Sequence, residues 1–416
     1  MTVTAEMVDA AAQRIAGVVP PTPLHRSERL SALSGAEVWL KREDLQVVRS
    51  YKVRGAYHLI SLLDRDTRAA GVVTASAGNH AQGVAFSCAA LGVPGRVYLP
   101  ATTPWQKRRR IAALGGDRIE VIVTGETYDE AAAAAEDDAR RTGASLVPAF
   151  DDVRTVVGQG TVTRELAGQL GRDLDTLVLP VGGGGLLAGS IAWLRERAPR
   201  TRVVGVEPLG AACVGAALAA GEPVELAELD TFVDGAALRR AGAVPFTVIQ
   251  GSGAELVAVS SGQVCSEMLS LYDVEGIIAE PAGALATAAL TDGTIGGIEA
   301  GSTVVCVISG GNNDISRYAE IIERAMLHEG RKHYFMVEFQ QEPGALRRFL
   351  DEVLGPDDDI TLFEYIKRNN RETGPALVGI ELARPEDAAA LLARMAAAPW
   401  RVQPVDPASP LFRFLV

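Results

Sequence analysis

Short, almost entirely apolar segments alternate with alanine-rich segments along most of the chain. The apolar segments contain many Val, Ile and Leu residues, as is typical of parallel strands that helices cover on both faces. Alanine-rich segments such as 129–142 are strong helix formers. The pattern predicts an open α/β fold with room for two sheets. The strands expected are 37–41, 72–75, 96–99, 119–123, 177–179, 203–207, 256–259 and 304–309.

The pattern changes near Gly330. An expected helix over 316–328 leads into a new series of elements in the order βαββαβ, which is that of a ferredoxin-like domain. We therefore expect an α/β domain over residues 1–329 and a smaller α+β domain over residues 330–416. The strands of the smaller domain are expected at 333–339, 360–366, 376–381 and 401–404, and its helices at 345–354 and 385–398.

The composition is that of a globular protein and narrows the classes of partner. The 416 residues include 52 acidic against 40 basic side chains, which gives a net charge of −12. This balance disfavours nucleic-acid phosphates and anionic membranes as partners. The longest uncharged stretch, 176–194, contains Pro180 and four consecutive glycines. We expect a strand, a loop and a helix start there instead of a membrane span.

The cysteines indicate a reducing compartment. None forms a C-x-x-C pair and each lies among apolar residues, so free, buried thiols are expected. Residues 1–12 carry two acids and no apolar core segment, so we expect no signal peptide and a cytoplasmic location. The four cysteines are Cys88, Cys213, Cys265 and Cys306.

The first candidate site is a charged run, residues 41–56, that follows an expected strand. Such a run is commonly a solvated face of the protein. This run also opens a helix, where Arg49, Lys52 and Arg54 are electrostatically unfavourable unless an anion lies nearby. A lysine beside a helix N-terminus and other cations loses basicity, as an imine-forming amine requires. Composition alone leaves both interpretations open.

The second candidate site is the turn and helix start formed by Ser76, Ala77, Gly78, Asn79 and His80. Free backbone N–H groups at such a helix start bind a carboxylate or phosphate well. The alternative is an ordinary helix cap supplied by Ser76 or Asn79. His80 is interpreted as structural more readily than as catalytic.

The third candidate site is a loop between a buried strand and a helix, Gly182-Gly183-Gly184-Gly185-Leu186. Consecutive glycines let the backbone approach a ligand and form an anion-binding nest. With Ala188 and Glu207 the loop also satisfies a loose dinucleotide fingerprint. For the loop alone, binding of a nicotinamide nucleotide, binding of a phosphate and tight packing all stay open.

Together with Ser309-Gly310-Gly311-Asn312, these three segments resemble the fold-type II pyridoxal phosphate enzymes. Within that group the chain is similar to the threonine dehydratases (threonine ammonia-lyases) of the short biosynthetic form. The resemblance covers essentially the whole chain, including residues 361–365. It implies a catalytic domain of two open α/β subdomains, like tryptophan synthase β, and a C-terminal ACT-like regulatory domain of ferredoxin-like fold.

The resemblance also implies a role for each motif. Lys52 matches the lysine that forms the Schiff base with pyridoxal 5′-phosphate, and Asn79 matches the contact to the ring hydroxyl of that cofactor. Ser309 matches the residue that faces the pyridine nitrogen. The phosphate would be held by Gly182, Gly183, Gly184, Gly185 and Leu186. The substrate carboxylate would be held by Ser76, Ala77, Gly78, Asn79 and His80.

The implied reaction is the dehydration and deamination of L-threonine to 2-oxobutanoate and ammonia, the first step of isoleucine biosynthesis. The cofactor serves as an electron sink while the protein supplies orientation and charge placement. Lys52, once displaced by the substrate amine, would remove the Cα proton. A neutral Ser309 hydroxyl would leave the pyridine nitrogen unprotonated, which favours prompt elimination over reprotonation.

Two positions differ from those of the related serine racemases. Those enzymes carry a serine where this chain has Ala77, so the second proton donor of a two-base racemase is missing here. Their divalent-metal site needs a second acid where this chain has Cys213. No divalent metal is therefore expected, and a monovalent cation near Glu207 stays an open alternative.

For the C-terminal domain, the resemblance implies feedback inhibition by isoleucine, opposed by valine, and for the whole chain a homotetramer. The turn Glu342-Pro343-Gly344 is of a type that accepts the charged ends of a ligand, or it is an ordinary turn. No residue identifies the effector, so the coupling is a hypothesis about two states that a ligand biases.

Two other classes of function are retained at this point. One is a related lyase or replacement enzyme acting on L-serine or another β-substituted amino acid. The other is a nucleotide-binding or amino-acid-sensing protein without catalysis. Lys52 argues against a sensor, which needs no imine-forming lysine. The basic run 107–110 is expected to be a solvated or intersubunit surface and not a nucleic-acid contact.

Overall fold

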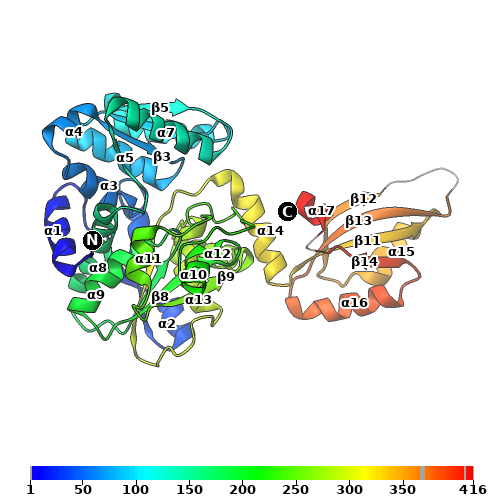
Figure 1. The fold of residues 1–416 in the computed structure, drawn as a ribbon. Coiled ribbons are helices and arrows are strands. Elements are labelled where there is room, and N and C mark those ends of the chain that lie inside the picture. The colour runs from blue at the N-terminus through cyan, green and yellow to red at the C-terminus, as the bar shows by residue number, and fades with distance from the viewer. Residues whose placement is uncertain (1, 366–370, 407–408, 416) are drawn as a thin grey trace. The chain divides into compact units, whose positions relative to one another are not determined.

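The computed structural model describes residues 2–365, 371–406 and 409–415, and the elements below are those of these residues. The chain divides into two compact units, residues 1–314 and 315–416 (Figure 1). In the described part of the chain, no helix is both long enough and apolar enough to cross a membrane.

The larger sheet of the first unit has six strands in the order β1-β2-β10-β7-β8-β9. All neighbouring strands in it are parallel except β1 and β2. The strands are β1 (Leu24–Arg26), β2 (Glu37–Arg42), β7 (Thr176–Pro180), β8 (Arg202–Pro208), β9 (Glu255–Val259) and β10 (Thr303–Ile308). The helices of this lobe are α1 (Ala5–Ile15), α2 (Glu28–Ser34), α8 (Val153–Leu170), α9 (Gly185–Arg197), α10 (Cys213–Ala220), α11 (Ala243–Ile249), α12 (Ser261–Glu275) and α13 (Pro281–Thr291).

Helices pack on both faces of the larger sheet and form the core of this lobe with it. Strand β7 is buried throughout, as is β10. Side chains of α8 and α9 share one apolar cluster with these two strands. On the other side, α13 packs on the central strands. The double cover explains why the strands are continuous apolar runs in the sequence.

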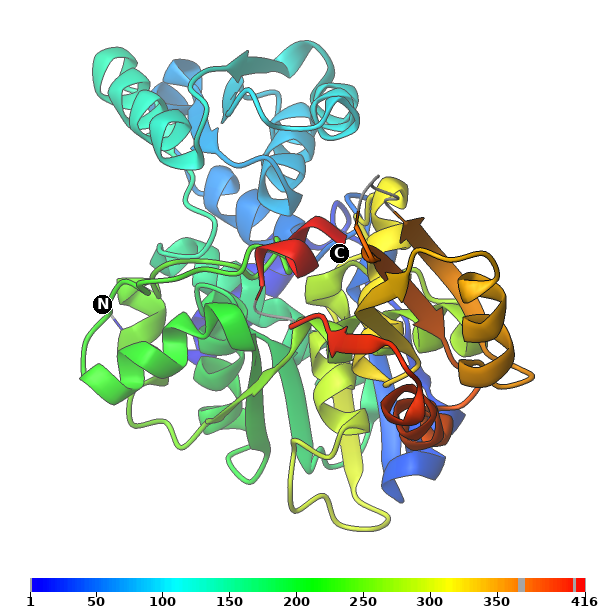
Figure 2. The same cartoon turned by 90° about the vertical axis from the view of Figure 1, so that its right-hand side faces the viewer.

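The smaller sheet of the first unit has four parallel strands in the order β5-β4-β3-β6. Its residues lie in sequence between β2 and β7, so this lobe, cyan in Figure 2, is inserted into the larger one. The strands are β3 (Val72–Ala75), β4 (Gly95–Leu99), β5 (Ile119–Val123) and β6 (Ser145–Leu146). The helices are α3 (Lys52–Ser61), α4 (Arg65–Ala70), α5 (Asn79–Leu91), α6 (Trp105–Gly115) and α7 (Tyr128–Thr142).

The second unit contains an antiparallel sheet in the order β12-β13-β11-β14. This is the strand order of a ferredoxin-like fold, as the sequence predicts. Packing of Phe339, Phe349 and Trp400 fills its core. The elements are α14 (Tyr318–His328), β11 (Lys332–Gln340), α15 (Ala345–Val353), β12 (Asp359–Tyr365), β13 (Thr373–Glu381), α16 (Ala388–Ala397), β14 (Arg401–Pro404) and α17 (Pro410–Leu415).

The expected strands of the first unit are all present, with ends that differ by at most one residue. The sequence pattern missed β1 and β6, which are too short to show a periodicity. Residue 366, the expected end of one strand, lies outside the described residues.

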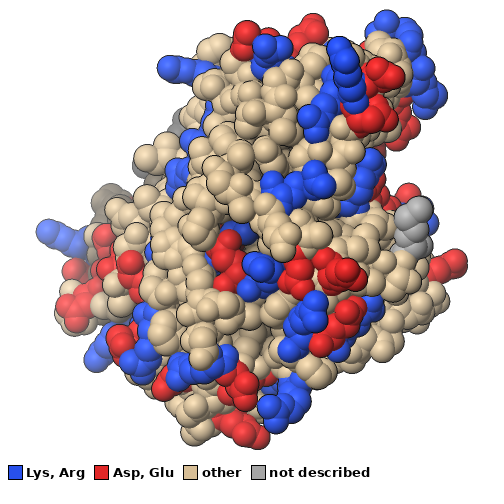
Figure 3. All heavy atoms as spheres, turned by 90° about the vertical axis from the view of Figure 1, so that its left-hand side faces the viewer, with Lys and Arg blue, Asp and Glu red and all other residues tan. Residues whose placement is uncertain are grey.

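The four cysteines are buried and free, which confirms the expectation of free, buried thiols. On the face drawn in Figure 3, Lys and Arg side chains are interspersed with Asp and Glu.

Candidate active site

The candidate motifs follow the carboxyl ends of parallel strands. Strands β2, β10 and β7 are neighbours in the larger sheet. They lead into the Lys52 segment, Ser309 and the glycine loop, respectively, while β3 of the smaller sheet leads into Ser76. Ligands of open α/β folds bind outside the carboxyl ends of the strands. The topology therefore directs the candidate segments of the larger sheet to a single edge of that sheet.

Lys52 is the first residue of α3, and the loop after β10 holds the segment before it. Tyr51 donates a backbone hydrogen bond to the Ser309 carbonyl at 3.1 Å, and Gly311 donates one to Arg49 at 2.9 Å. The Lys52 Nζ atom lies 3.4 Å from the Ala149 carbonyl oxygen, at the long limit of a hydrogen bond. The lysine is thus fixed by its backbone while its amine has only a weak polar contact.

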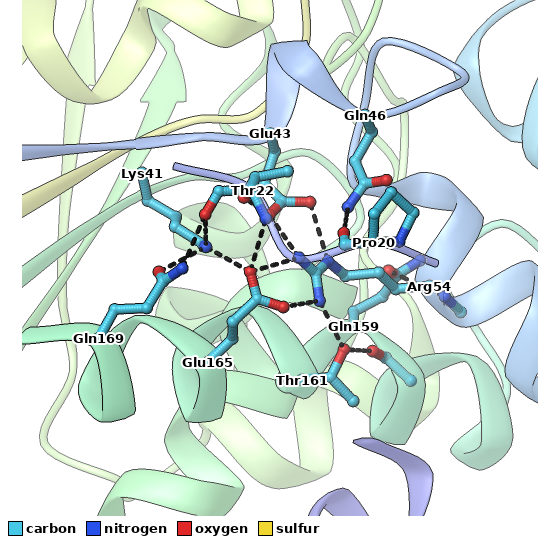
Figure 4. Close-up of polar contacts among 12 residues, drawn as sticks. Pro20, Thr22, Lys41, Glu43, Gln46, Arg54, Gln159, Thr161, Glu165 and Gln169 are labelled. Atoms are coloured by element: carbon cyan, nitrogen blue, oxygen red, sulfur yellow. Dashed lines mark hydrogen bonds and ion pairs between the residues drawn. The ribbon is translucent and has the colours of Figure 1, made fainter. Parts of the chain in front are cut away.

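A buried ion cluster explains the other charges of this segment (Figure 4). Arg54 donates hydrogen bonds of 2.8 and 2.7 Å to Glu43 and of 2.9 and 3.1 Å to Glu165. Lys41 Nζ lies 2.5 Å from Glu165 and 2.9 Å from Gln169. Arg54 and Lys41 are buried. For Arg54, the anions that the sequence requires nearby are therefore two protein carboxylates, and no bound ligand is needed to neutralise it.

These carboxylates keep the cluster charged. Burial alone would lower the pKa of Arg54, but Glu43 and Glu165 raise it overall. Burial likewise opposes ionisation of Glu165, but Arg54 and Lys41 lower the pKa of this carboxyl overall. Because the cluster joins α3 to α8 and to the turn after β2, it fixes the helix on which Lys52 lies.

The turn after β3 leaves the start of α5 available to a ligand. Gly78 occupies the cap position of α5, and no side chain within the described ranges caps the helix. Ser76 instead accepts a hydrogen bond from the Gly78 amide at 3.3 Å. The ordinary-cap interpretation of Ser76 or Asn79 is therefore wrong. Uncapped N–H groups at a helix start favour an anion. Ala77 packs beside a small apolar cluster of this lobe.

His80 is buried beside this turn. Its Nε2 atom lies 2.7 Å from the Val147 carbonyl, which places the ring proton on Nε2. Burial, with a further contribution from the charge of Lys52, lowers the pKa of His80 to about 4. The Nδ1 atom is an acceptor without a hydrogen-bond partner among the described residues. A neutral, oriented imidazole with an unused acceptor therefore lies close to Lys52.

The glycine loop also ends in an uncapped helix. Gly184, the cap residue of α9, has a φ angle of +89°, which L side chains rarely adopt. No side chain of the described chain caps this helix. Gly183 lies against the ring of Phe150, where a Cβ atom would come within 2.4 Å of the ring. Such tight packing and free amides together suit a nest for a phosphate.

Comparison with known proteins decides between the ligands that this edge could take. Residues 15–310 match the family described as "Pyridoxal-phosphate dependent enzyme", and residues 323–415 match the "C-terminal regulatory domain of Threonine dehydratase". A relative from Mycobacterium bovis named "L-threonine dehydratase biosynthetic IlvA" is 61% identical over 98% of this chain and 95% of its own length. A relative of the same name from Bacillus subtilis is 46% identical over 97% of this chain and 95% of its own length. The chain belongs to the biosynthetic L-threonine dehydratase family.

Solved structures agree with this family. Threonine deaminase isoform 2 from Solanum lycopersicum has a TM-score of 0.72 and 35% identity, covering 78% of this chain and 96% of that one. Maize serine racemase has a TM-score of 0.72 and 28% identity, covering 79% of this chain and 99% of that one. The fold-type II catalytic fold and the regulatory domain expected from the sequence are therefore confirmed, and so is pyridoxal phosphate as the cofactor.

The residues at the sheet edge fit the cofactor of the threonine dehydratase family. Lys52 offers an amine, the glycine loop offers an uncapped helix start for a phosphate, and His80 Nδ1 is a buried acceptor without a described partner. Ser309 is 3% exposed, and the hydrogen bond that its hydroxyl makes within the described part of the chain is a 3.3 Å contact with the Ala282 carbonyl. Since hydroxyl hydrogen bonds are usually shorter, this hydroxyl can redirect its hydrogen to a ligand.

Glu207 has a structural partner in this member of the family. Its two carboxylate oxygens accept hydrogen bonds from Val214 and Gly215 at 2.8 and 2.9 Å, at the start of α10. Burial raises the pKa of Glu207 to about 7. Cys213, at the second-acid position of the racemases, directs its thiol towards the Gly182 carbonyl at 3.6 Å. Glu207 thus stabilises the helix beneath the glycine loop.

Sequence reasoning missed one site residue, Glu280, and gave no role to Asn312. Glu280 precedes α13 and is buried. It accepts a hydrogen bond from Asn79 Nδ2 at 2.5 Å, and Asn312 Nδ2 donates to Asn79 Oδ1 at 2.6 Å. The available signal was a lone acid between apolar residues, Ala279-Glu280-Pro281. Nothing local links it to a residue 201 positions away.

Proposed function

We propose that the protein catalyses the pyridoxal phosphate dependent dehydration and deamination of L-threonine to 2-oxobutanoate and ammonia. One observation carries this proposal. Lys52 is held by the Ser309 loop and lies at the sheet edge that also bears an uncapped glycine loop. This arrangement occurs in a chain that is 61% identical to a relative named L-threonine dehydratase.

The proposed cofactor site uses the residues inferred from the sequence. Lys52 would bind the cofactor covalently, Asn79 would contact its ring hydroxyl and Ser309 would face its ring nitrogen. The phosphate would accept hydrogen bonds from the amides of the loop. Uncapped helix N–H groups and the positive end of the α9 dipole both favour the negative charge of a phosphate. The loop residues are Gly182, Gly183, Gly184, Gly185 and Leu186.

The substrate carboxylate would bind at the start of α5. The amides of the turn Ser76–His80 offer hydrogen bonds there, and the helix dipole favours the negative charge. A substrate held by its carboxylate at this point is oriented for reaction at Cα. Ala77 offers no hydroxyl, so this turn supplies no proton donor at its second position. The absence of that hydroxyl favours elimination over racemisation.

Proton transfer is assigned to Lys52. When bound, pyridoxal phosphate supplies an electron sink for the charge left at Cα. The Lys52 amine would take the Cα proton, because its backbone is fixed and the contacts given for its Nζ atom, with the Ala149 carbonyl and the Tyr51 ring, are weak. Ser309 is neutral and would serve as a hydrogen-bond partner to the ring nitrogen of the cofactor without placing a charged side chain beside it.

We also propose that residues 330–416 form a regulatory domain, on a catalytic domain of residues 1–329. The match of residues 323–415 to the regulatory domain of threonine dehydratase supports this role. The expected effector is isoleucine, opposed by valine, in a cytoplasmic homotetramer. Binding of such an end-product to a separate domain would couple the effector site to the substrate site.

The experiment is 2-oxobutanoate release by the full-length protein loaded with pyridoxal phosphate. L-Threonine and L-serine are compared, each with and without isoleucine. We expect turnover of L-threonine that isoleucine suppresses. Turnover of L-serine alone would replace the substrate with another β-hydroxy amino acid and keep the reaction type. Absence of turnover with both amino acids in a folded, cofactor-loaded protein would overturn the proposal.

A further inference from the structure

Glu280 is a buried acid at the candidate active site, and its own helix does not explain the position of its carboxylate. It occupies the cap position of α13, yet no described side chain makes a cap hydrogen bond to that helix. Its carboxylate turns instead to the segments that carry Asn79 and Asn312. The residue is 5% exposed. Burying a carboxylate is costly unless its hydrogen bonds compensate for the loss of water.

Three segments close a ring of hydrogen bonds around this carboxylate. Asn79 Nδ2 donates to Glu280 Oε1 at 2.5 Å, and the backbone N–H of Asn312 donates to Glu280 Oε2 at 3.2 Å. Asn312 Nδ2 in turn donates to Asn79 Oδ1 at 2.6 Å. The Glu280 amide donates to the Gly310 carbonyl at 3.1 Å. The same loop, Ser309–Asn312, therefore holds both Glu280 and the backbone before Lys52.

Gly310 shows that the fold leaves space for the carboxylate. A Cβ atom built at Gly310 would lie 2.4 Å from Glu280 Oε1, closer than non-bonded atoms approach. A side chain at this position would displace Glu280 from Asn79. The glycine after Ser309 is thus required by the position of the acid as well as by the turn.

The ring determines which way the Asn79 amide points. Its Nδ2 atom faces an acceptor and its Oδ1 atom faces a donor. The flipped amide would place a donor against a donor and an acceptor against an acceptor. An amide nitrogen has two hydrogens, and the contact with Glu280 uses one. The second hydrogen has no hydrogen bond to the residues that the structure describes, so it can serve a ligand.

We propose that Glu280 is a positioning residue that orients the Asn79 amide towards the ring hydroxyl of the cofactor. The inference rests on the proposed function, which assigns that contact to Asn79. It explains why an acid, and not a neutral residue, is buried here. The Asn79 side chain and the backbone N–H of Asn312 both donate to this residue. Only a carboxylate accepts both hydrogen bonds without presenting a donor to either partner.

The surroundings of Glu280 agree with a role as acceptor. Its partners in the hydrogen-bond ring are neutral, while the exposed pair Lys107 and Asp234 contributes opposing charges nearby. Burial, with a smaller contribution from Asp234, raises the pKa of Glu280 to about 7. Hydrogen bonds to a charged group are about twice as strong as neutral ones, so the ionised carboxylate holds Asn79 most firmly.

The test is a double-mutant cycle on the dissociation constant for pyridoxal phosphate, measured by titrating the stripped full-length protein. Its variants are Glu280→Gln, Asn79→Ala and the double variant. We expect Glu280→Gln to raise the dissociation constant about tenfold, because a glutamine presents a donor to Asn79 or to the Asn312 amide. In the Asn79→Ala background the same change should have almost no effect. The absorption and circular dichroism of bound cofactor should change in the same variants.

Glu267→Gln is the matched control. Glu267 is also a buried acid, but it pairs with Arg29 and lies on α12, away from these segments. It should lose stability and keep the dissociation constant of the unchanged protein. If Glu280→Gln does not fold, Asn312→Ala removes the other contact of the Asn79 amide and should also raise the dissociation constant.

Three results would overturn the proposal. The first is an unchanged dissociation constant in folded Glu280→Gln, or in Asn312→Ala where Glu280→Gln does not fold. The second is an equal effect of Glu280→Gln with and without Asn79. The third is an Asn79→Ala variant that binds the cofactor as tightly as the unchanged protein. Each is distinct from failure of the proposed function, which is loss of 2-oxobutanoate release from the unchanged, loaded protein.

Discussion

Arg54 donates two hydrogen bonds to Glu43, from Nε at 2.8 Å and from Nη2 at 2.7 Å, one to each carboxylate oxygen. The side chains are 1% and 0% exposed, so water does not compete for either partner. Paired contacts between a guanidinium and a carboxylate combine strength with a defined geometry. Because Arg54 follows Lys52 by two residues on α3, this pair fixes the first turn of the helix against the end of β2.

Loss of the guanidinium should therefore be costly to the fold. We expect Arg54→Met to lower the free energy of unfolding by about 3–5 kcal/mol, because it leaves the buried Glu43 and the partly buried Glu165 without this cation. Urea unfolding followed by circular dichroism measures the change. Arg140→Met is the control, since Arg140 is 68% exposed and pairs only with surface acids on α7. Its loss should stay below about 0.5 kcal/mol. Equal losses in the two variants would contradict the assigned role of the cluster.

Lys52 should be indispensable for turnover and dispensable for folding. We expect Lys52→Ala to abolish 2-oxobutanoate release and the yellow colour of bound cofactor, while the unfolding midpoint stays close to that of the unchanged protein. Lys52→Arg should behave in the same way, because it keeps the charge and cannot form an imine. Borohydride reduction followed by peptide mass analysis checks the bond directly. A cofactor-sized mass increase on another lysine would refute the assignment.

Gly184 should not tolerate a side chain. Its φ of +89° is strained for any L residue, and an added Cβ atom would lie 2.9 Å from Pro245. We expect Gly184→Ala to destabilise the fold by about 1–3 kcal/mol and to weaken binding of pyridoxal phosphate through displacement of the loop. Gly168→Ala on α8 is the matched control, since its Cβ atom would meet open space. That variant should be neutral or slightly stabilised. Titration with pyridoxal phosphate measures the dissociation constant of both variants. Equal values for Gly184→Ala and Gly168→Ala would contradict the role of the loop.

Two buried acids should make the fold weaker as the pH rises. Burial raises the pKa of Glu280 and of Glu207 from 4.5 to about 7. A carboxyl with a raised pKa binds its proton more tightly in the folded state, so its contribution is complete below 4.5 and is lost as the pH rises through about 7. The loss corresponds to about 3 kcal/mol for each group.

Unfolding free energies measured at about pH 5 and about pH 8 test this dependence. We expect the decrease between the two values to be smaller in Glu280→Gln than in the unchanged protein. Glu136→Gln alters an acid that is 60% exposed and should leave the decrease as it was. An identical pH dependence in all three proteins would contradict the raised pKa of Glu280.

Removal of the second unit should separate catalysis from regulation. All proposed cofactor and substrate contacts lie within residues 1–314, one of the two compact units. A chain that ends at residue 329 should therefore release 2-oxobutanoate from L-threonine and should lose inhibition by isoleucine. The dependence of initial rate on isoleucine concentration, compared with the full chain, measures this. Inhibition that persists would place the effector site in the catalytic unit.

Local pattern was sufficient to predict the longer strands and to locate the candidate segments. The apolar runs that became β7 and β10 are buried on both faces, so their composition alone marks them. The glycine loop and the turn before Asn79 were predicted at helix starts, where the structure has them. Each of these features depends on a few consecutive residues.

Contacts between distant segments could not be predicted in the same way. For the charged run 41–56, composition alone favoured a solvated face over an anion site, because the acid Glu165 that neutralises Arg54 lies 111 positions later. Glu280 and Asn79 are 201 positions apart, and their contact depends on how two lobes of the first unit meet. Periodicity records which side of an element is buried, and it does not record the partner.

The strand order also has a consequence for the synthesis of the chain. Apart from the three-residue β1, the neighbour of β2 is β10, which is made some 260 residues later. The loop after β10 then supplies the carbonyl that holds Tyr51, next to Lys52. A ribosome-bound chain can complete the smaller sheet early, but the candidate active site stays unassembled until residue 312 has emerged. Until then the segment before Lys52 lacks the carbonyl that holds it, and β2 lacks its long-range partner, so an unpaired strand edge is exposed during synthesis.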